Sequence, residues 1–192
     1  MKNLKNSIIA FLAVATLSSC GYNDMVAKQE SVGGQWAQVE TSYQRRADLI
    51  PNLVSTVKGY AEFEKSTFVE VTEARSKASS MNINVDDLTP ENMSKFQAAQ
   101  SQLSGSLSRL MATFERYPDL KANQNFLQLQ AQLEGTENRI SVERRKFNDV
   151  TKDYNTFIKQ FPRNVYAGWF NFEKKGYFEA DAGTENAPKV EF

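Results

Sequence analysis

Apolar residues recur at alternating intervals of three and four along most of this chain, and this spacing constrains its fold more than any other feature. One series runs from Tyr22 to Tyr43 with Gln29 as its only polar member, and two more cover residues 93–117 and 126–161. Such spacing places the residues on one stripe of an α-helix, which is buried against other helices at a shallow crossing angle. The sequence therefore predicts long amphipathic helices.

Proline and capping residues divide these stripes into four predicted helices. The second is expected over about 49–79, with Pro51 in its first turn, where a missing N–H costs nothing. Thr89-Pro90 is expected to begin the third, and Asn123 to cap a fourth that ends before Pro162. Short connections between long amphipathic helices favour an all-α fold, an elongated antiparallel (up-down) four-helix bundle over residues 20–162.

After Pro162 the pattern changes to a short aromatic-rich C-terminal extension, residues 163–192. Aromatic residues crowd between Tyr166 and Phe178, and Gly168 and Gly176 interrupt any long helix. We expect the extension to pack on the bundle and cover apolar surface that unequal helices leave open. The alternative is an exposed aromatic patch for a partner or a membrane interface.

The chain's only cysteine, Cys20, follows a short apolar segment at the N-terminus. Lys2 and Lys5 precede an apolar run of about 10 residues, which leads through Ser18-Ser19 to the cysteine. The run is about 15 Å long as a helix, whereas a bilayer core is roughly 30 Å thick, so it cannot comfortably span a membrane. This order resembles a bacterial lipoprotein signal peptide, residues 1–19, with diacylglycerol attached to the sulfur of Cys20. An ordinary signal peptide with a coincidental cysteine is the alternative.

The composition excludes most common catalytic and binding chemistries. There is no histidine, so Ser-His-Asp, Cys-His and Glu-x-x-His sites cannot be built. Basic and acidic residues number 23 each, and loss of Lys2 and Lys5 with the signal peptide leaves a net charge of −2. Because the two signs are interleaved, no basic stripe is available for nucleic acid. We therefore expect no enzymatic activity, no cofactor, no metal site and no nucleic-acid partner.

Two groups of polar residues are candidates for a structural or recognition role. Glu143 falls on the apolar stripe of the fourth helix, where a carboxylate is costly unless paired. We expect it to pair with an Arg or Lys of another helix, and a ligand site in the bundle is the alternative. The second group lies between the first two predicted helices, and we expect it to form their corner, with recognition at the bundle tip as the alternative. Its members are Arg45, Arg46, Asp48, Pro51 and Asn52.

Several runs of sequence resemble the LemA family. They are Tyr43–Val54 with Thr56–Tyr60, Tyr117–Asn123, Glu137–Ile140, Tyr154-Asn155, and the segments 177–180 and 187–190. The resemblance covers nearly all of the chain after Cys20 and implies an elongated helical bundle outside the cytoplasmic membrane. Many members are held by an uncleaved N-terminal membrane helix, from which the short segment before Cys20 departs. The resemblance implies no reaction and supplies no catalytic residues.

These features together predict a lipid-anchored protein of the cell envelope. We expect a non-enzymatic scaffold or adaptor, held to the membrane through lipidated Cys20, with an envelope protein as its partner. The alternative is a binding module for a small envelope ligand, either a lipid or a peptidoglycan fragment. Gly21 follows the cysteine without an inner-membrane retention signal, so we expect an outer-membrane lipoprotein that faces the periplasm.

Overall fold

The computed structural model describes residues 2–58, 65–114 and 117–180, and of residues 2–20 only the helical backbone. The described residues form helices and connecting segments with no strand among them, which confirms the all-α prediction. The elements are α1 (Lys2–Lys58), α2 (Lys65–Ser80), the 3-10 helix η1 (Val85–Asp87), α3 (Pro90–Phe114), α4 (Pro118–Lys121), α5 (Gln124–Lys159) and α6 (Arg163–Trp169).

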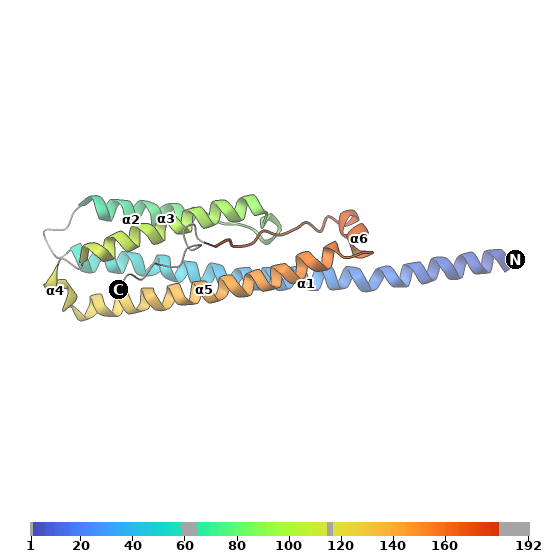
Figure 1. Cartoon of the computed structure of the whole chain (residues 1–192), viewed down its shortest axis with the longest axis horizontal. Helices are drawn as coiled ribbons and strands as arrows, with labels where there is room; N and C mark the ends of the chain where they lie inside the picture. The colour runs from blue at the N-terminus through green and yellow to red at the C-terminus, as the bar shows by residue number, and fades with distance from the viewer. Residues whose placement is uncertain (1, 59–64, 115–116, 181–192) are drawn as a thin grey trace, which may run out of the picture.

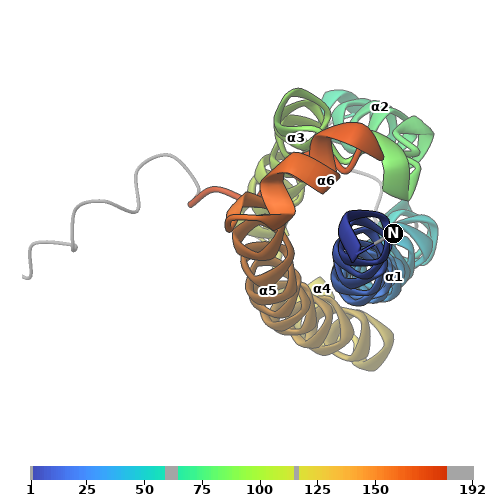
Figure 2. The same ribbon diagram turned by 90° about the vertical axis from the view of Figure 1, so that its right-hand side faces the viewer.

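The long helices lie along one axis and form an elongated body (Figure 1). Helices α1 and α5 run side by side in opposite directions, and α2 packs against α3. Figure 2 looks along the axis and shows α6 lying across one end of the body. Beyond that end, α1 continues toward the N-terminus. No helix within the described ranges has an apolar stretch long enough to cross a membrane.

The core consists of two clusters of buried residues along the axis. The proximal cluster, nearer to residue 20, is rich in aromatic rings, whereas the distal cluster is mainly aliphatic. The proximal cluster comprises Met25, Val32, Trp36, Val39, Tyr43, Ile83, Leu88, Met93, Phe96, Ile140, Phe147, Tyr154, Ile158, Ala167 and Phe178. The distal cluster comprises Ile50, Leu53, Val54, Val57, Val71, Ala74, Ala78, Leu103, Leu107, Leu110, Phe114, Leu120, Phe126 and Leu133.

Helix α1 does not end at the predicted corner. It continues through Pro51 to Lys58, so the predicted start of a second helix near residue 49 is wrong. Pro51 has no N–H for the carbonyl of Ala47, four residues earlier, and this carbonyl instead accepts a hydrogen bond of 2.7 Å from Arg75 Nε. Arg75 belongs to α2. It therefore compensates for the proline and fixes α2 against α1 with one contact.

The start of α3 and both ends of α5 lie close to their predicted positions. Helix α3 begins at Pro90, and Thr89 Oγ1 accepts a hydrogen bond of 3.3 Å from the N–H of Asn92. The side chain of Asn123 accepts from two backbone N–H groups at the start of α5, which ends at Lys159. Local capping signals therefore suffice for these boundaries.

Candidate functional site

An extended segment, residues 172–180, contacts both α3 and α5 along the proximal half of the body. Asn155 Nδ2 donates to the carbonyl of Lys175 at 2.8 Å, and its Oδ1 accepts from the N–H of Lys175 at 2.9 Å. Asn148 makes the same pair of bonds with Phe178, and both measure 2.9 Å. Gln97 does so with Glu179, at 2.8 and 3.0 Å.

These three amide side chains recognise the backbone of the extended segment and not its side chains. A primary amide has a donor and an acceptor side by side, which matches the N–H and C=O of one extended residue. Asn148 and Asn155 are seven residues apart, about two turns, and so lie on one face of α5. Helices α3 and α5 thus present backbone-binding groups to one polypeptide strand from two sides.

Further contacts hold the N-terminal part of the extended segment. The hydroxyl of Tyr154 donates to the carbonyl of Glu173 at 3.0 Å, and burial raises the pKa of this tyrosine to about 12. Lys175 is buried, and its Nζ donates to the carbonyls of Val85 and Asp86, both at 3.0 Å. Burial lowers the pKa of Lys175, and the nearby carboxylate of Asp86 opposes this shift. These bonds join the segment to α5 and to η1.

Gly176 lies against the start of α3. Its N–H donates to the carbonyl of Leu88 at 2.7 Å. A Cβ atom at this position would lie 2.9 Å from Cα of Pro90, a backbone atom that cannot move aside locally. The close approach therefore requires glycine at this point.

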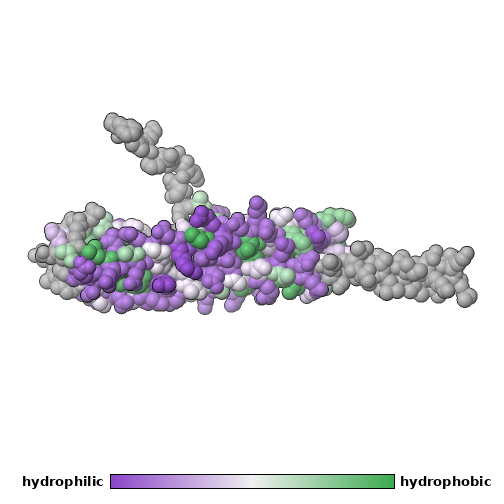
Figure 3. Space-filling model, turned by 90° about the horizontal axis from the view of Figure 1, so that it is seen from below, coloured by the Kyte–Doolittle hydropathy of each residue, from purple (hydrophilic) through white to green (hydrophobic). Residues whose placement is uncertain are grey.

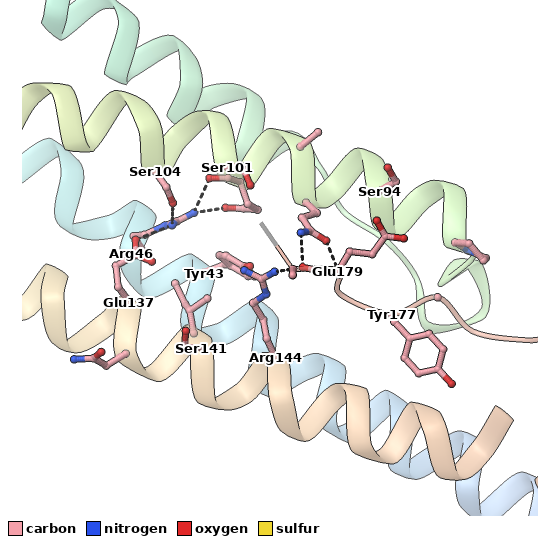
Figure 4. A pocket seen from close by; sticks show the side chains of 18 of the residues that line it. Tyr43, Arg46, Ser94, Ser101, Ser104, Glu137, Ser141, Arg144, Tyr177 and Glu179 are labelled. Atoms are coloured by element: carbon pink, nitrogen blue, oxygen red, sulfur yellow. Dashed lines mark hydrogen bonds and ion pairs between the residues drawn. The ribbon is translucent and has the colours of Figure 1, made fainter. Parts of the chain in front are cut away.

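A groove of about 780 Å³ opens between α3 and α5, beside the extended segment and beyond its C-terminal end (Figure 4). Figure 4 shows Tyr43 and Arg46 of α1 between the two helices, with Glu179 at one side. We call this space between the two helices the α3/α5 groove. Both of its walls carry polar side chains at intervals of four and three. These are Gln97, Ser101 and Ser104 on α3, and Glu137, Ser141 and Arg144 on α5.

Arg46 is buried in this groove and connects three helices. Its Nη1 donates to Ser104 Oγ and to Glu137 Oε1, both at 2.7 Å, and its Nη2 donates to Gln100 Oε1 at 2.6 Å. The guanidinium carbon lies 5.1 Å from the ring centroid of Tyr43. A buried guanidinium needs such partners to offset its desolvation. Arg46 is therefore a polar cross-link from α1 to α3 and α5.

The remaining members of the predicted corner lie on the exposed side of α1. Arg45, Asp48, Pro51 and Asn52 are exposed, and Asp48 accepts a hydrogen bond of 2.8 Å from Gln44 of its own helix. Because α1 is continuous here, neither Asp48 nor Asn52 caps a helix start, and the corner prediction is wrong. The spacing does distinguish Arg46 from Arg45, since Arg46 lies three residues after Tyr43 on the apolar stripe.

Glu143 is buried as expected of its position, but its interhelical partner differs from the predicted cation. Gln35 Nε2 of α1 donates to Glu143 Oε2 at 2.7 Å. The cations that contact this carboxylate within the described residues are Lys146 at 3.2 Å and Arg139 at 3.8 Å, both from α5 itself. The hydrogen bond from Gln35 lowers the pKa of Glu143 against the opposing effect of burial, and Lys146 and Arg139 lower it further.

Two predictions concern residues whose side chains the structure does not describe. The signal peptide, residues 1–19, and the sulfur of Cys20 lie outside the described side chains, so lipid attachment stays a prediction.

Within the described ranges, no group of three or more His, Cys, Asp or Glu side chains is placed to hold a metal ion.

Comparison with known proteins shows which family this sequence belongs to. A model of the LemA family matches residues 35–192. The chain belongs to the LemA family. Protein LemA of Metamycoplasma hominis is 27% identical over 158 residues, which cover 82% of this chain and 68% of that protein. Magnetosome protein MamQ of Magnetospirillum gryphiswaldense is 25% identical over 195 residues, which cover 92% and 72%. Magnetosome protein MamQ 2 of Paramagnetospirillum magneticum is 25% identical over 190 residues, which cover 90% and 69%.

The LemA match confirms the family drawn from the sequence motifs. It includes all three backbone-binding amides and both walls of the α3/α5 groove, and it begins after Cys20. Sequence reasoning missed Gln97 and Asn148, and it named Asn155 within a family motif without assigning it a role, because a polar amide beside an apolar stripe carries no periodic signal. The seven-residue interval between the two asparagines is the one pattern that could have suggested a shared face.

Proposed function

We propose that this LemA-family protein is a lipid-anchored, non-enzymatic scaffold or adaptor of the cell envelope, and that it binds an extended polypeptide of a partner protein in the α3/α5 groove. The observation that carries the proposal is the extended segment itself. Three amide side chains on α3 and α5 already hold one strand of polypeptide by its backbone. The groove lies beside this strand and continues past Glu179 along the same two helices, to Ser104 and Glu137.

The groove offers a second strand the same kind of contact. Main-chain hydrogen bonds supply affinity in this mode of recognition, and pockets for alternate side chains supply specificity. Each hydrogen bond contributes a net of about 0.5–1.5 kcal/mol, so several along one strand are needed for a stable complex. Exposed Ser141 and the partly exposed carboxylate of Glu137 offer hydrogen-bonding groups to such a strand on the α5 wall.

Cys20 places the groove in the envelope under this proposal. A diacylglycerol on its sulfur anchors the chain, and the elongated up-down four-helix bundle then stands close to the membrane, because the helix that follows starts without a linker. We place the protein at the outer membrane, facing the periplasm. Lipid labelling of Cys20→Ser tests the anchor: loss of the label supports it, and normal labelling contradicts it.

Photo-crosslinking in intact cells tests the adaptor role. Benzoylphenylalanine is placed at Ser101 or Ser141, one on each wall of the groove, and at exposed Gln128 of α5, outside the groove, as the matched control. We expect discrete adducts with the same envelope protein from both groove positions, joined to one short segment of that protein, and none from Gln128. Absence of adducts at both groove positions, or the same adducts from Gln128, would contradict the proposal.

The volume of the groove supports the binding of a small envelope ligand as a second candidate. Small-molecule sites typically enclose about 300–1,000 Å³, and this groove measures about 780 Å³. Its charged lining, with Glu137 and Arg144, suits a peptidoglycan fragment better than a lipid chain. Titration with purified muropeptides, followed by NMR, tests this. Saturable shifts at Ser101 and Ser141 support the candidate, and unchanged spectra remove it.

A further inference from the structure

Large hydrophobic side chains are exposed together at the α6 end of the body. Phe161 is 84% exposed, Trp169 is 72% exposed and Phe170 is 55% exposed. Val165 and Tyr22 are also exposed. Elsewhere in the described chain, exposed large hydrophobic residues occur singly, and the flank in Figure 3 is mainly hydrophilic. A group of exposed aromatic residues on one end is therefore a feature that requires an explanation.

This aromatic end adjoins the residues that follow Cys20. The ring of Tyr22 packs edge-on against Phe170, with centroids 4.9 Å apart, and against Phe172 at 5.7 Å. Gly21 lies against Arg163, since a Cβ atom on it would be 3.9 Å from Arg163 Cγ. Any anchor at or before residue 20 therefore brings this end of the body to the membrane first.

The chemistry of the aromatic end suits the surface of a phospholipid bilayer. Tryptophan and tyrosine are enriched at membrane–water interfaces, where an apolar ring and a polar tip are both accommodated. Residues 159–172 include Lys159 and Arg163 and no acidic residue. Basic groups beside exposed aromatic rings favour a surface that carries phosphate.

We propose that the aromatic end, comprising Tyr22, Phe161, Val165, Trp169 and Phe170, rests in the headgroup region of the membrane that anchors the chain. The proposal rests on the membrane anchoring in the proposed function, but not on a lipid at Cys20 in particular. The contact fixes the orientation of the body, with α6 toward the bilayer and the distal cluster away from it. It also sets the distance of the α3/α5 groove from the membrane.

Fluorescence quenching by brominated lipid tests the contact with the full-length protein. The protein is reconstituted in vesicles of phosphatidylcholine and phosphatidylglycerol, with or without bromine on the acyl chains. The chain has two tryptophans, and Trp36 is buried, so quenching reports on Trp169. We expect a loss of Trp169 emission in brominated vesicles relative to unbrominated ones, because a tryptophan at the membrane interface lies close to the acyl chains. The variant Trp169→Phe should lose this response.

A matched control moves the reporter to the far end of the body. In a Trp169→Phe background, Leu127→Trp places an exposed tryptophan on α5 beside the distal cluster, and we expect no quenching. Equal emission of wild-type protein in both kinds of vesicle would overturn the proposal. Quenching equal to that of Leu127→Trp would also overturn it. If wild-type Trp169 is not quenched and the protein forms dimers that Trp169→Ser abolishes, the aromatic end contacts a second copy of the chain instead of the membrane.

Vesicle flotation separates this inference from the proposed anchor. Protein that floats without quenching of Trp169 is anchored but does not rest on its aromatic end, which contradicts the inference alone. Quenching in Cys20→Ser that still floats supports the aromatic contact and shows that this contact does not require a lipid at Cys20, whereas lipid labelling alone decides the anchor.

Discussion

The proximal and distal halves of the body use the same long helices but different kinds of contact. In the distal cluster, aliphatic side chains on the helix stripes pack directly against one another. In the proximal cluster, a segment that is not helical supplies Phe178. The centroid of its ring lies 6.1 Å from the ring centroid of Trp36 and 5.5 Å from that of Phe147. Among the described residues, the distal cluster thus takes all of its buried side chains from helices, whereas the proximal cluster also takes one from a strand held through its backbone.

This difference separates stability from recognition within one fold. Helix–helix packing of the distal kind buries its contact residues, and most backbone groups of a helix bond within that helix. The proximal half instead turns amide side chains toward a polypeptide strand and leaves a groove beside it. Variants of the two halves should therefore differ in what they disturb, as well as in how much stability they remove.

The largest effect is expected from loss of the central ring of the proximal cluster. Trp36 is buried, and its Nε1 donates to the carbonyl of Ile83 at 3.1 Å. Trp36→Ala should reduce the free energy of unfolding by about 3–5 kcal/mol, and Leu110→Ala in the distal cluster by about 2–5 kcal/mol. Urea denaturation followed by circular dichroism measures both. Only Trp36→Ala should also increase proteolysis of the extended segment, and equal proteolysis in the two variants would contradict the distinction.

The polar cross-link at Arg46 should respond unequally to loss of its two charges. Glu137→Leu leaves a buried guanidinium without a counter-charge and should cost about 3 kcal/mol. Arg46→Met should cost less, because the side chain of Glu137 is 44% exposed and can be rehydrated. Thermal unfolding of the two variants measures this order. A larger loss of stability in Arg46→Met than in Glu137→Leu would contradict it, and would show that the guanidinium stabilises the fold through contacts other than its ion pair.

The backbone-binding amides should contribute according to their burial. Asn155 is buried, and Asn155→Ala removes two hydrogen bonds to Lys175, which should cost about 2 kcal/mol. Gln97→Ala removes the equivalent pair with Glu179 at an exposed site and should cost under about 1 kcal/mol. Equal losses by urea denaturation would indicate that the amides do not act through these bonds.

The effect expected at Glu143 is also small, and it depends on pH. Its pKa in the folded protein lies below the ordinary value of 4.5, so its stabilising effect is present above that pH and is lost as pH falls through the lowered pKa. Glu143→Gln should cost no more than about 1.5 kcal/mol at neutral pH. It should also lose less stability than the wild type on acidification, in denaturation curves recorded at pH values on both sides of 4.5. Parallel pH profiles of the two proteins would contradict this.

Local signals in the sequence predicted some boundaries well and others not at all. Thr89 and Asn123 act on neighbouring N–H groups, so the starts of α3 and α5 follow from the sequence. The continuation of α1 through Pro51 does not, because its compensation comes from Arg75, 28 residues from the carbonyl that it binds. A long-range donor of this kind leaves no pattern near the proline.

The candidate site was less accessible to prediction than the fold. The sequence grouped Arg46 with the exposed residues of a predicted corner, whereas Arg46 is buried and its partners lie on α3 and α5. The partner of Glu143 is the uncharged Gln35, which charge pairing could not suggest. The path of residues 172–180 depends on contacts with three separate elements, none of which their own sequence specifies.

Native-state hydrogen exchange tests most directly whether the extended segment is bound through its backbone. The N–H groups of Lys175, Phe178 and Glu179 donate to Asn155, Asn148 and Gln97. We predict that these amides exchange at least about 100-fold more slowly than unprotected amides, although no helix or sheet contains them. Asn155→Ala should accelerate exchange at Lys175 most. Exchange of all three amides at unprotected rates in the wild-type protein would contradict the account.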